Sequence, residues 1–450
     1  MQEGGYAMNK RQEQRPITVP FAATPVGEPP IIKTWANFGV WTERMLAALE
    51  VGVKGGRWHT LIDKVFSRRN LFDAARRVTG NRGAPGVDHV DVDLFESRLG
   101  EELDKLEELL RTDTYCPQKI LRTWIPKPGS TEKRPLGIPT VRDRVVQTAV
   151  LHVIEPIFDH TFHEHSYGFR HGRGCQQALR QVERLLKEEY VYVVDADLKS
   201  YFDTIPHDKL MDRVRGKVSD SRVLRLIEMF LRQGILEGLS SWTPEEGTPQ
   251  GAVISPLLAN IYLNPLDHLM AEAGFPLVRY ADDFVILCRT AEEAVMVLEK
   301  VRAWVDANGL TLHPTKTKIV DARTDGFEFL GYRFKAEIRS PRQKSLAKFK
   351  DAVRAKTRRN NGNSLACIAA SLKPTLQGWF GYFRHCHPNV FRDLDGYIRG
   401  RLRSILRKRS RRRGRGRGRD HHRWPNAFFK AQGLFSLKEA HAVFCQSCLR

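Results

Sequence analysis

Apolar residues recur with two different periods along the chain, and the period predicts which segments are helices and which are strands. Between Asp93 and Arg111 the apolar residues fall on one face of a helix, and the Asp93-x-x-Glu96 pattern predicts where that helix starts. The β-branched run over residues 190–198 predicts a strand that is buried on both faces. The segment LVRYADDFVILC (277–288) predicts two strands joined by a short turn.

Turn and capping residues delimit the remaining elements. An extended hairpin is predicted over residues 115–137, where a Gly-Ser pair separates two proline-containing stretches. Further helices are predicted over 175–189, 222–233, 255–273 (with Ser255 as the N-cap) and 290–308 (with a Thr290-x-x-Glu293 capping box). Because helices and short strands alternate without an internal repeat, the pattern predicts an α+β fold with a small sheet beside helices.

The composition is that of a folded, multidomain protein with a large positive charge. The 450 residues are enough for about three domains, and 41% hydrophobic with 28% charged residues is typical of globular proteins. The formal net charge of +21 predicts a polyanionic partner, and nucleic acid fits better than a membrane surface. We expect a cytoplasmic protein without a membrane span, since long apolar runs, a secretion signal and a disulfide framework are all lacking in the sequence.

A basic run marks the C-terminal part of the chain. From Arg407 to Arg419, nine of thirteen residues are lysine or arginine, interleaved with glycine. Such a run cannot form a core, and we expect it to neutralise phosphates of RNA or DNA; a solvated tail that serves solubility is the alternative. The candidate phosphate contacts are Arg407, Arg409, Arg411, Arg412, Arg413 and Arg415.

Carboxylates at the ends of apolar strands are the candidate chemistry. Asp197 ends the predicted buried strand, and Asp282 and Asp283 lie at the tip of the strand pair. Ionised carboxylates beside apolar segments need compensation by cations or solvent, and two bridged divalent ions are the usual apparatus for in-line phosphoryl displacement. Oxygen ligands favour Mg²⁺. An Asp-Asp pair can also be an ordinary turn, a reading that the apolar flanks and the positive charge disfavour.

Eight segments of the chain stand out in order: NRGAPGVD (81–88), RPLGIPTVRDRVVQ (134–147), SYGFRHGRG (166–174), DADLKSYFDTIPH (195–207), GTPQGAVISPLLANIYL (247–263), YADD (280–283), GLTLHPTKTK (309–318) and FLGY (329–332). Together they resemble the group II intron-encoded reverse transcriptases and maturases, specifically the bacterial type that lacks an endonuclease. The resemblance implies a right-hand polymerase with fingers and palm over 61–335, an α-helical thumb/maturase (X) domain over 336–405 and a basic nucleic-acid-binding segment over 406–450. Residues 1–60 would be a flexible leader and a helical extension.

The resemblance assigns roles to residues near the carboxylates. Asp197, Asp282 and Asp283 match the catalytic, metal-binding triad, while Asp195 stays unassigned and Asp203 is expected to cap the following helix. Phe202 resembles a steric gate that excludes a 2′-hydroxyl, with a core aromatic as the alternative. The nucleotide-binding and primer-binding candidates are Lys127 and Arg134, which flank the Gly-Ser turn and suit a triphosphate, Gln250 and Gly251 in the PQG element, and Lys316, which suits a primer phosphate or else is solvated.

The resemblance also implies a function and partners. An RNA-directed DNA polymerase would copy group II intron RNA for retrohoming and assist splicing, using Mg²⁺, dNTPs, an RNA template with a DNA primer, and target DNA. Two alternatives stay open, an RNA-binding splicing factor with an idle polymerase and a host-defence reverse transcriptase of the retron- or CRISPR-linked kind.

In the maturase-like segment, Trp379, Tyr382 and Phe383 share one helical face, which predicts packing, with RNA contacts left to neighbouring cations. A single Cys445-x-x-Cys448 pair argues against the family's endonuclease and is a weak zinc candidate.

Overall fold

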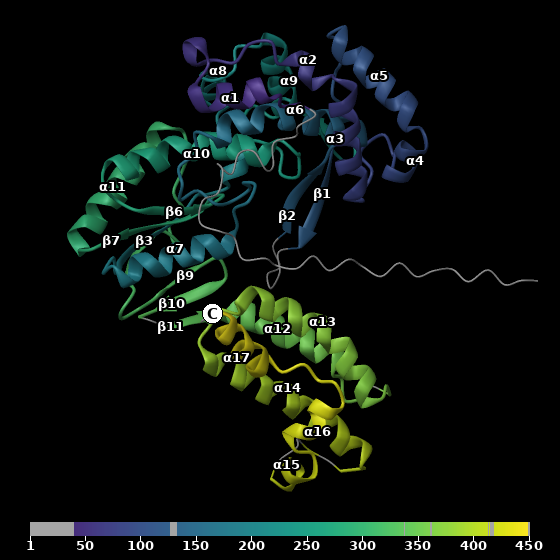
Figure 1. Ribbon diagram of the computed structural model, residues 1–450, viewed down its shortest axis with the longest axis vertical. Helices are drawn as coiled ribbons and strands as arrows, with labels where there is room; N and C mark the ends of the chain where they lie inside the picture. Colours follow the sequence, from purple (N-terminus) through teal and green to yellow (C-terminus); the bar gives the residue numbers. More distant parts are fainter. Residues whose placement is uncertain are drawn as a thin grey trace, which may run out of the picture.

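The computed structural model describes residues 40–126, 133–336, 338–360, 362–412, 414 and 418–448. Figure 1 shows one part in which helices surround two sheets, and a second, elongated part formed by the C-terminal helices. Among the described residues, no helix combines the length and the apolar content that crossing a bilayer requires.

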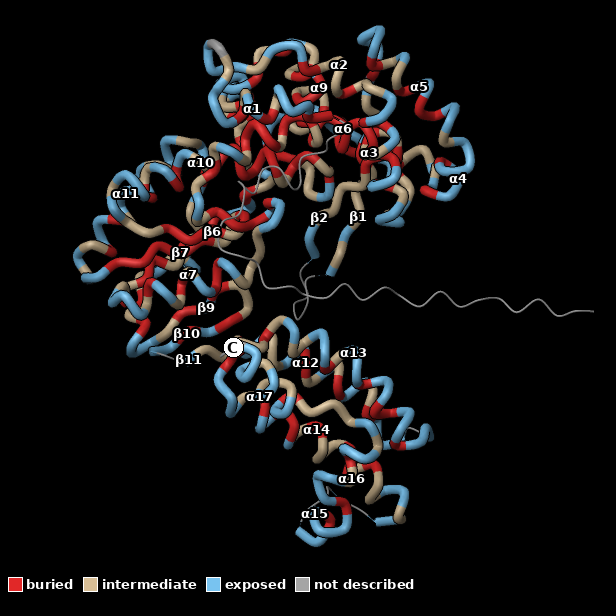
Figure 2. Tube along the Cα trace, in the orientation of Figure 1, coloured by how far each residue is buried: buried red, intermediate tan, exposed pale blue. Residues whose placement is uncertain are grey.

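One antiparallel sheet, which we call the carboxylate sheet, lies between two hydrophobic cores. Its strand order is β6 (Leu277–Tyr280), β7 (Asp283–Cys288), β3 (Tyr192–Asp197), β8 (Lys318–Asp321). Alternate residues of β3 and β7 enter opposite cores, as their period of two requires. On one face the sheet meets α10 (Ser255–Glu272) and α11 (Ala291–Ala307), and on the other α7 (Cys175–Lys187). Figure 2 shows β6 and β7 as almost continuously buried.

A second sheet is built from two hairpins. Its order is β2 (Lys133–Ile138), β1 (Ile120–Pro126), β4 (Ile235–Glu237), β5 (Ser240–Trp242), with β1 and β4 parallel. The hairpin predicted over 115–137 is therefore confirmed. The Gly137 backbone N–H donates to the Gln250 carbonyl at 2.6 Å. A Cβ on Gly251, whose φ is 107°, would lie 2.4 Å from the Gly137 carbonyl oxygen, so only glycine fits where this sheet meets the PQG loop.

The first core is centred on α6 (Val141–Asp159), whose apolar residues are buried on most sides. The helices of this part are α1 (Glu43–Val51), α2 (Ile62–Val65), α3 (Arg68–Gly80), α4 (Val92–Ser97), α5 (Leu99–Arg111), α8 (His207–Arg215) and α9 (Ser221–Leu231), with short 3-10 turns at Lys54–Gly56 and Tyr201–Asp203. This core supports the carboxylate sheet from one side only.

The second core joins the other face of the carboxylate sheet to the C-terminal helices. It includes β9 (Phe327–Phe329) and β10 (Tyr332–Lys335), which with β11 (Ile338–Pro341) form a three-stranded sheet. The helices are α12 (Gln343–Lys356), α13 (Leu365–Phe383), α14 (Pro388–Arg409), α15 (Arg419–Arg423), α16 (Asn426–Ala431) and α17 (Leu437–Cys448). They extend away from the sheets in Figure 1.

Several local predictions need correction. The helix predicted from Asp93 is two helices, α4 and α5, which meet at Arg98, and Asp91 rather than Asp93 caps the first. Ser255 is the first residue of α10 instead of its cap, and its hydroxyl donates to the Pro249 carbonyl. Asp203 does not cap α8; its carboxylate accepts a hydrogen bond from Gln250. The Thr290 capping box is confirmed, as is the end of that helix at Asn308.

Candidate active site

Strand register brings the predicted carboxylates together. Asp197 on β3 lies directly opposite Asp283 on β7 in the antiparallel ladder. Opposite residues in such a ladder have Cα atoms ~4.5–5.5 Å apart, and their side chains leave the sheet on the same face. Asp282 precedes β7 in the two-residue turn that joins it to β6, where Ala281 has φ 61°. The three residues thus gather at one end of the carboxylate sheet.

Burial and mutual repulsion raise the pKa values of the carboxylic acids in this cluster. Burial, followed by repulsion from Asp195 and the other carboxylates, raises the pKa of Asp283 from 3.8 to about 7. Burial raises the pKa of Asp195 to about 6, against attraction from Lys318. The pKa of Asp282 is also raised, first by burial and then by Asp197. Bringing a cation to this end of the sheet would therefore stabilise the ionised carboxylates.

A lysine from the GLTLHPTKTK segment partly compensates this charge. The backbone N–H of His313 donates to the Asp197 carbonyl at 2.7 Å, which brings the segment alongside the end of β3. The Lys316 ammonium then lies 2.7 Å from a carboxylate oxygen of Asp197. The lysine side chain is 61% exposed, so it is free to exchange partners with solvent or with a phosphate. Its role as a primer contact stays a prediction.

In the described part of the chain, no three His, Cys, Asp or Glu side chains form a ready-made metal cage. Mg²⁺ is commonly held by one or two carboxylates together with water and substrate phosphates. The paired Asp197 and Asp283, with Asp282 beside them, match that partial ligand set in number and chemistry. These residues therefore fit a divalent ion that is completed by substrate.

A buried network fixes the turn that carries Asp282 and Asp283. Arg279 and Asp267 are both 0% exposed and form an ion pair of 2.5 Å. The Arg279 guanidinium also donates to the Ala281 carbonyl at 3.0 Å and to Asn260 at 2.8 Å. Asn260 in turn donates to the Gly168 carbonyl at 2.8 Å. Since an unpaired buried charge is costly, the network holds its geometry tightly.

Gly168 completes this support from the SYGFRHGRG segment. A Cβ built on Gly168 would lie 2.2 Å from the Ala281 nitrogen and 2.8 Å from the Tyr280 carbonyl carbon. The segment approaches the turn so closely that no side chain fits between them. Sequence reasoning assigned no role to Gly168, Arg279 or Asn260. For Arg279 a signal was available, since an arginine stands there inside an otherwise apolar strand.

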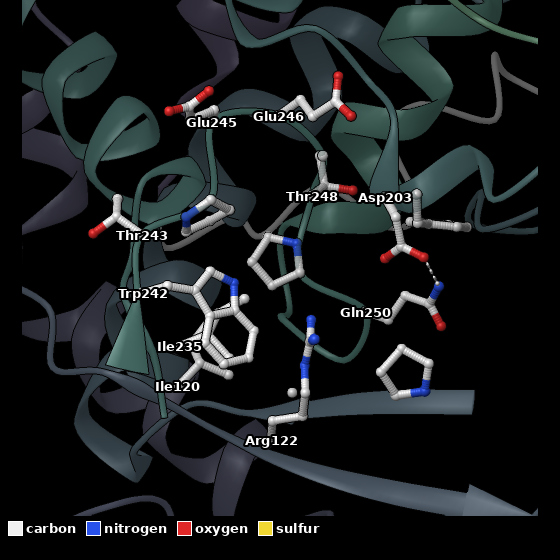
Figure 3. A pocket seen from close by; sticks show the side chains of 16 residues that line it. Ile120, Arg122, Asp203, Ile235, Trp242, Thr243, Glu245, Glu246, Thr248 and Gln250 are labelled. Atoms are coloured by element: carbon white, nitrogen blue, oxygen red, sulfur yellow. Dashed lines mark hydrogen bonds between the residues drawn. The ribbon is translucent and has the colours of Figure 1, made fainter. Parts of the chain in front are cut away.

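The nucleotide-binding candidates are partly brought together. Phe202 and Gln250 line one pocket with Arg122, Asp203 and Trp242 (Figure 3). The Gln250 side-chain amide donates to Asp203 at 3.4 Å, and burial raises the pKa of that acid. The loop before Gln250 is tied to the Phe202 segment, because the Thr248 N–H donates to the Phe202 carbonyl at 2.6 Å. Residues of two sequence motifs, DADLKSYFDTIPH and GTPQGAVISPLLANIYL, therefore line this pocket.

The structure describes Arg134 but not Lys127, the other residue predicted to bind the triphosphate. Arg134 is exposed on β2 opposite Ile125, and strand alternation puts it on the face opposite to Arg122, away from the pocket floor. Lys127 lies outside the described residues. The predicted triphosphate clamp is therefore not assembled by the described residues alone.

The basic run is partly built into the C-terminal helices. Arg407 lies on α14 and pairs with Asp420 at 2.5 Å, and Arg409 donates to the Asn363 carbonyl. Arg411 and Arg412 are exposed, while Arg413 and Arg415 lie outside the described residues. The predicted phosphate contacts thus include two arginines that are engaged within the protein. Separately, the Cys445 sulfur lies 3.6 Å from a His441 ring nitrogen, without further metal-ligating neighbours among described residues.

Comparison with known proteins defines the class of the sheet-bearing part. The model of the reverse transcriptase (RNA-dependent DNA polymerase) family matches residues 125–334, which contain every strand of the carboxylate sheet. The model of the group II intron maturase-specific domain matches residues 346–424, from α12 to just after α15. The first part is thus a reverse transcriptase domain of mixed helices and strands, and it is followed by a maturase-specific domain.

Curated relatives extend the match. Protein YkfC of Escherichia coli (strain K12) is 36% identical over 304 residues, covering 58% of this chain and 79% of that protein. The group II intron-encoded protein LtrA of Lactococcus lactis subsp. cremoris is 36% identical over 219 residues, covering 47% of this chain but only 36% of LtrA. A solved chain from a partial Cas6-RT-Cas1--Cas2 complex has a TM-score of 0.35 at 23% identity, over 55% of this chain and 42% of that chain. The chain belongs to the family of group II intron-encoded reverse transcriptases and maturases.

Proposed function

We propose that this protein is an RNA-directed DNA polymerase that copies group II intron RNA into DNA during retrohoming and also assists splicing of that RNA. The observation that carries the proposal is the cross-strand pairing of Asp197 with Asp283, beside Asp282, inside a reverse transcriptase domain. The retained carboxylates weigh against a splicing factor whose polymerase is idle, since splicing alone needs none of them.

Asp197, Asp282 and Asp283 would hold two Mg²⁺ ions. Bound there, the ions supply a lower pKa for the primer 3′-hydroxyl and a counter-charge for the leaving pyrophosphate. The chain's own contribution is to hold three carboxylates at fixed positions, through strand register for two of them and through the buried Arg279 network for the turn. Most of the rate enhancement then comes from positioning and charge neutralisation.

The incoming dNTP would lie between the carboxylates and the Gln250 loop. Phe202 would contact the sugar and reject a 2′-hydroxyl by shape, while Gln250 and Gly251 approach the base pair closely. Phe202 and Gln250 line one pocket, which supports this arrangement. The exposed position of Arg134 on a hairpin suits a triphosphate contact that forms when substrate binds, and Lys127 is proposed beside it from the sequence motif.

The molecule would use a right-hand architecture. We assign fingers and palm to residues 61–335, the thumb/maturase domain to 336–405 and a nucleic-acid-binding segment to 406–450. Helices α12–α14 extend away from the sheets in Figure 1, which supports a distinct helical unit, although the second hydrophobic core crosses the boundary at 335. The net charge of +21 supports intron RNA, target DNA and a template–primer duplex as partners. An RNA·DNA hybrid would be recognised by its backbone and shape.

Primer extension on an RNA template tests the proposal. The wild type should extend a DNA primer with dNTPs in Mg²⁺ and fail with EDTA. Asp282→Ala should abolish extension and keep intron splicing. Asp321→Ala is the matched control, because Asp321 lies in the same sheet opposite Tyr192, at the end away from the site, and should leave extension unchanged. A wild type that splices but never extends would establish the splicing-factor alternative instead.

A further inference from the structure

The turn between β9 and β10 adopts a conformation that one of its own residues disfavours. Phe329 and Tyr332 pair across a two-residue turn in which Leu330 has φ 47° and Gly331 has φ 80°. A bulky residue at positive φ persists only where its surroundings hold it there. Strand β9, which leads into this turn, contacts strand β7, whose first residue is Asp283. The turn therefore lies against the candidate active site.

Tyr382, in the last turn of α13, supplies contacts that hold this turn. Its hydroxyl donates to the Leu330 carbonyl at 2.8 Å. Its own carbonyl accepts from the hydroxyl of Tyr332 at 2.5 Å and from the side-chain amide of Gln176 at 2.7 Å. The Tyr382 and Tyr332 rings also pack together, with centroids 5.8 Å apart. Segments that are distant in sequence thus meet on one residue of the maturase-specific region.

Other contacts to the same turn come from α12 and the residue before it. The Gly331 carbonyl accepts from the Arg342 backbone N–H at 3.0 Å and from the Ser345 hydroxyl at 3.3 Å. These bonds do not involve Tyr382. Removing the Tyr382 hydroxyl therefore frees the Leu330 carbonyl while the rest of the turn stays attached, which makes the contribution of one bond measurable.

We propose that Tyr382 is a positioning residue of the polymerase site, which fixes the Leu330–Gly331 turn and through it the placement of Asp283. The inference rests on the proposed polymerase function and deepens it. It means that the helical region matched by the maturase model contributes to nucleotide addition as well as to RNA recognition. The two activities then share a structural element instead of residing in independent units.

Tyr382→Phe removes only the hydroxyl and is the first test. In steady-state primer extension we expect kcat to fall about tenfold and the half-saturating Mg²⁺ concentration to rise, because a strained turn loses one of its bonds beside a metal-binding carboxylate. The KM for dNTP and the affinity for intron RNA should stay unchanged. In metal-free protein, hydrogen–deuterium exchange should become faster in the peptide that covers residues 327–335.

Tyr397→Phe is the matched control. The Tyr397 hydroxyl also donates to a backbone carbonyl, that of Lys350, at 3.5 Å within the same helical region. It should leave kcat and exchange at 327–335 as in the wild type. Tyr332→Phe removes the hydrogen bond from the Tyr332 hydroxyl to the Tyr382 carbonyl. When it is combined with Tyr382→Phe, the loss of kcat should be smaller than the two single losses added together.

Two outcomes would overturn the inference. One is a Tyr382→Phe protein whose kcat and exchange match those of Tyr397→Phe. The other is a loss of extension that parallels an equal loss of intron RNA affinity, which would indicate a general structural role. If the wild type itself failed to extend primers, the proposed function would fall, while the exchange measurement would still report whether Tyr382 holds the turn.

Discussion

Gly168→Ala perturbs the candidate active site without touching any carboxylate. The added methyl group would lie 2.2 Å from the Ala281 nitrogen, 2.8 Å from the Tyr280 carbonyl carbon and 3.0 Å from the Ala281 Cα. Ordinary contacts between such atoms are ~3.5–4.0 Å. All three neighbours are backbone atoms, so no flexible side chain can yield. The turn that carries Asp282 must shift by roughly 1 Å or more to relieve the nearest contact.

The expected loss of activity is large compared with the loss of stability. A displacement of about 1 Å at a catalytic group can cost ~10²-fold in rate, whereas one extra methyl in a packed interior typically costs ~1–3 kcal/mol of unfolding free energy. Primer extension under saturating dNTP and primer–template should show a kcat reduced by ~10²-fold. Thermal unfolding should show a protein that is still folded, with a Tm lowered by several degrees.

Gly174→Ala supplies the control from the same sequence segment. Gly174 has φ −160°, an extended conformation open to any residue, and no atom lies within 4 Å of its added Cβ. Its kcat and Tm should remain close to wild type. The reasoning is refuted if Gly168→Ala keeps wild-type kcat, or if both variants lose activity to the same extent.

Four further outcomes follow from the site and the basic run. Because the pKa of Asp283 is about 7, protons compete with metal there, and the half-saturating Mg²⁺ concentration should fall as pH rises through that value; a titration independent of pH would contradict this. Phe202→Ala should raise rNTP incorporation relative to dNTP in single-nucleotide extension, and an unchanged ratio would remove its role as a gate. Replacing the exposed Arg411 and Arg412 with serine should reduce the slope of log affinity for RNA against log salt by about 1–2 at an unchanged Tm. Arg407→Ala should instead lower the Tm, since it breaks the pair with Asp420.

Local sequence signals were sufficient for much of the fold around the carboxylates. The β-branched run predicted β3, and the apolar flanks of YADD predicted the β6–β7 hairpin, because strand burial and turn formation depend on adjacent residues. The capping box at Thr290 was confirmed for the same reason. Where two residues compete for one local role, the pattern was ambiguous: Asp91 and Asp93 both suit an N-cap, and the chain uses the first.

Contacts between segments that are distant in the sequence could not be predicted from the residues around them. Nothing near Asp203 indicates that its carboxylate meets Gln250 instead of capping a helix, since the partner arrives from a different loop. The pairing of Arg407 with Asp420 likewise depends on how α14 and α15 are arranged, so the basic run alone predicted that Arg407 contacts a phosphate. The support of Ala281 by Gly168 is equally non-local. Such tertiary contacts override expectations drawn from composition.

The pairing of Asp197 with Asp283 has a consequence for how genes of this kind can change length. Successive side chains of a strand alternate between faces, so inserting or deleting one residue within β3 or β7 would swing a carboxylate into the apolar interior and reverse every neighbour along the ladder. Additions to the connection between these strands, residues 198–276, would leave the alignment untouched. Insertions and deletions should therefore accumulate in the segments between the two strands. The strands themselves tolerate substitutions but no shift in their register.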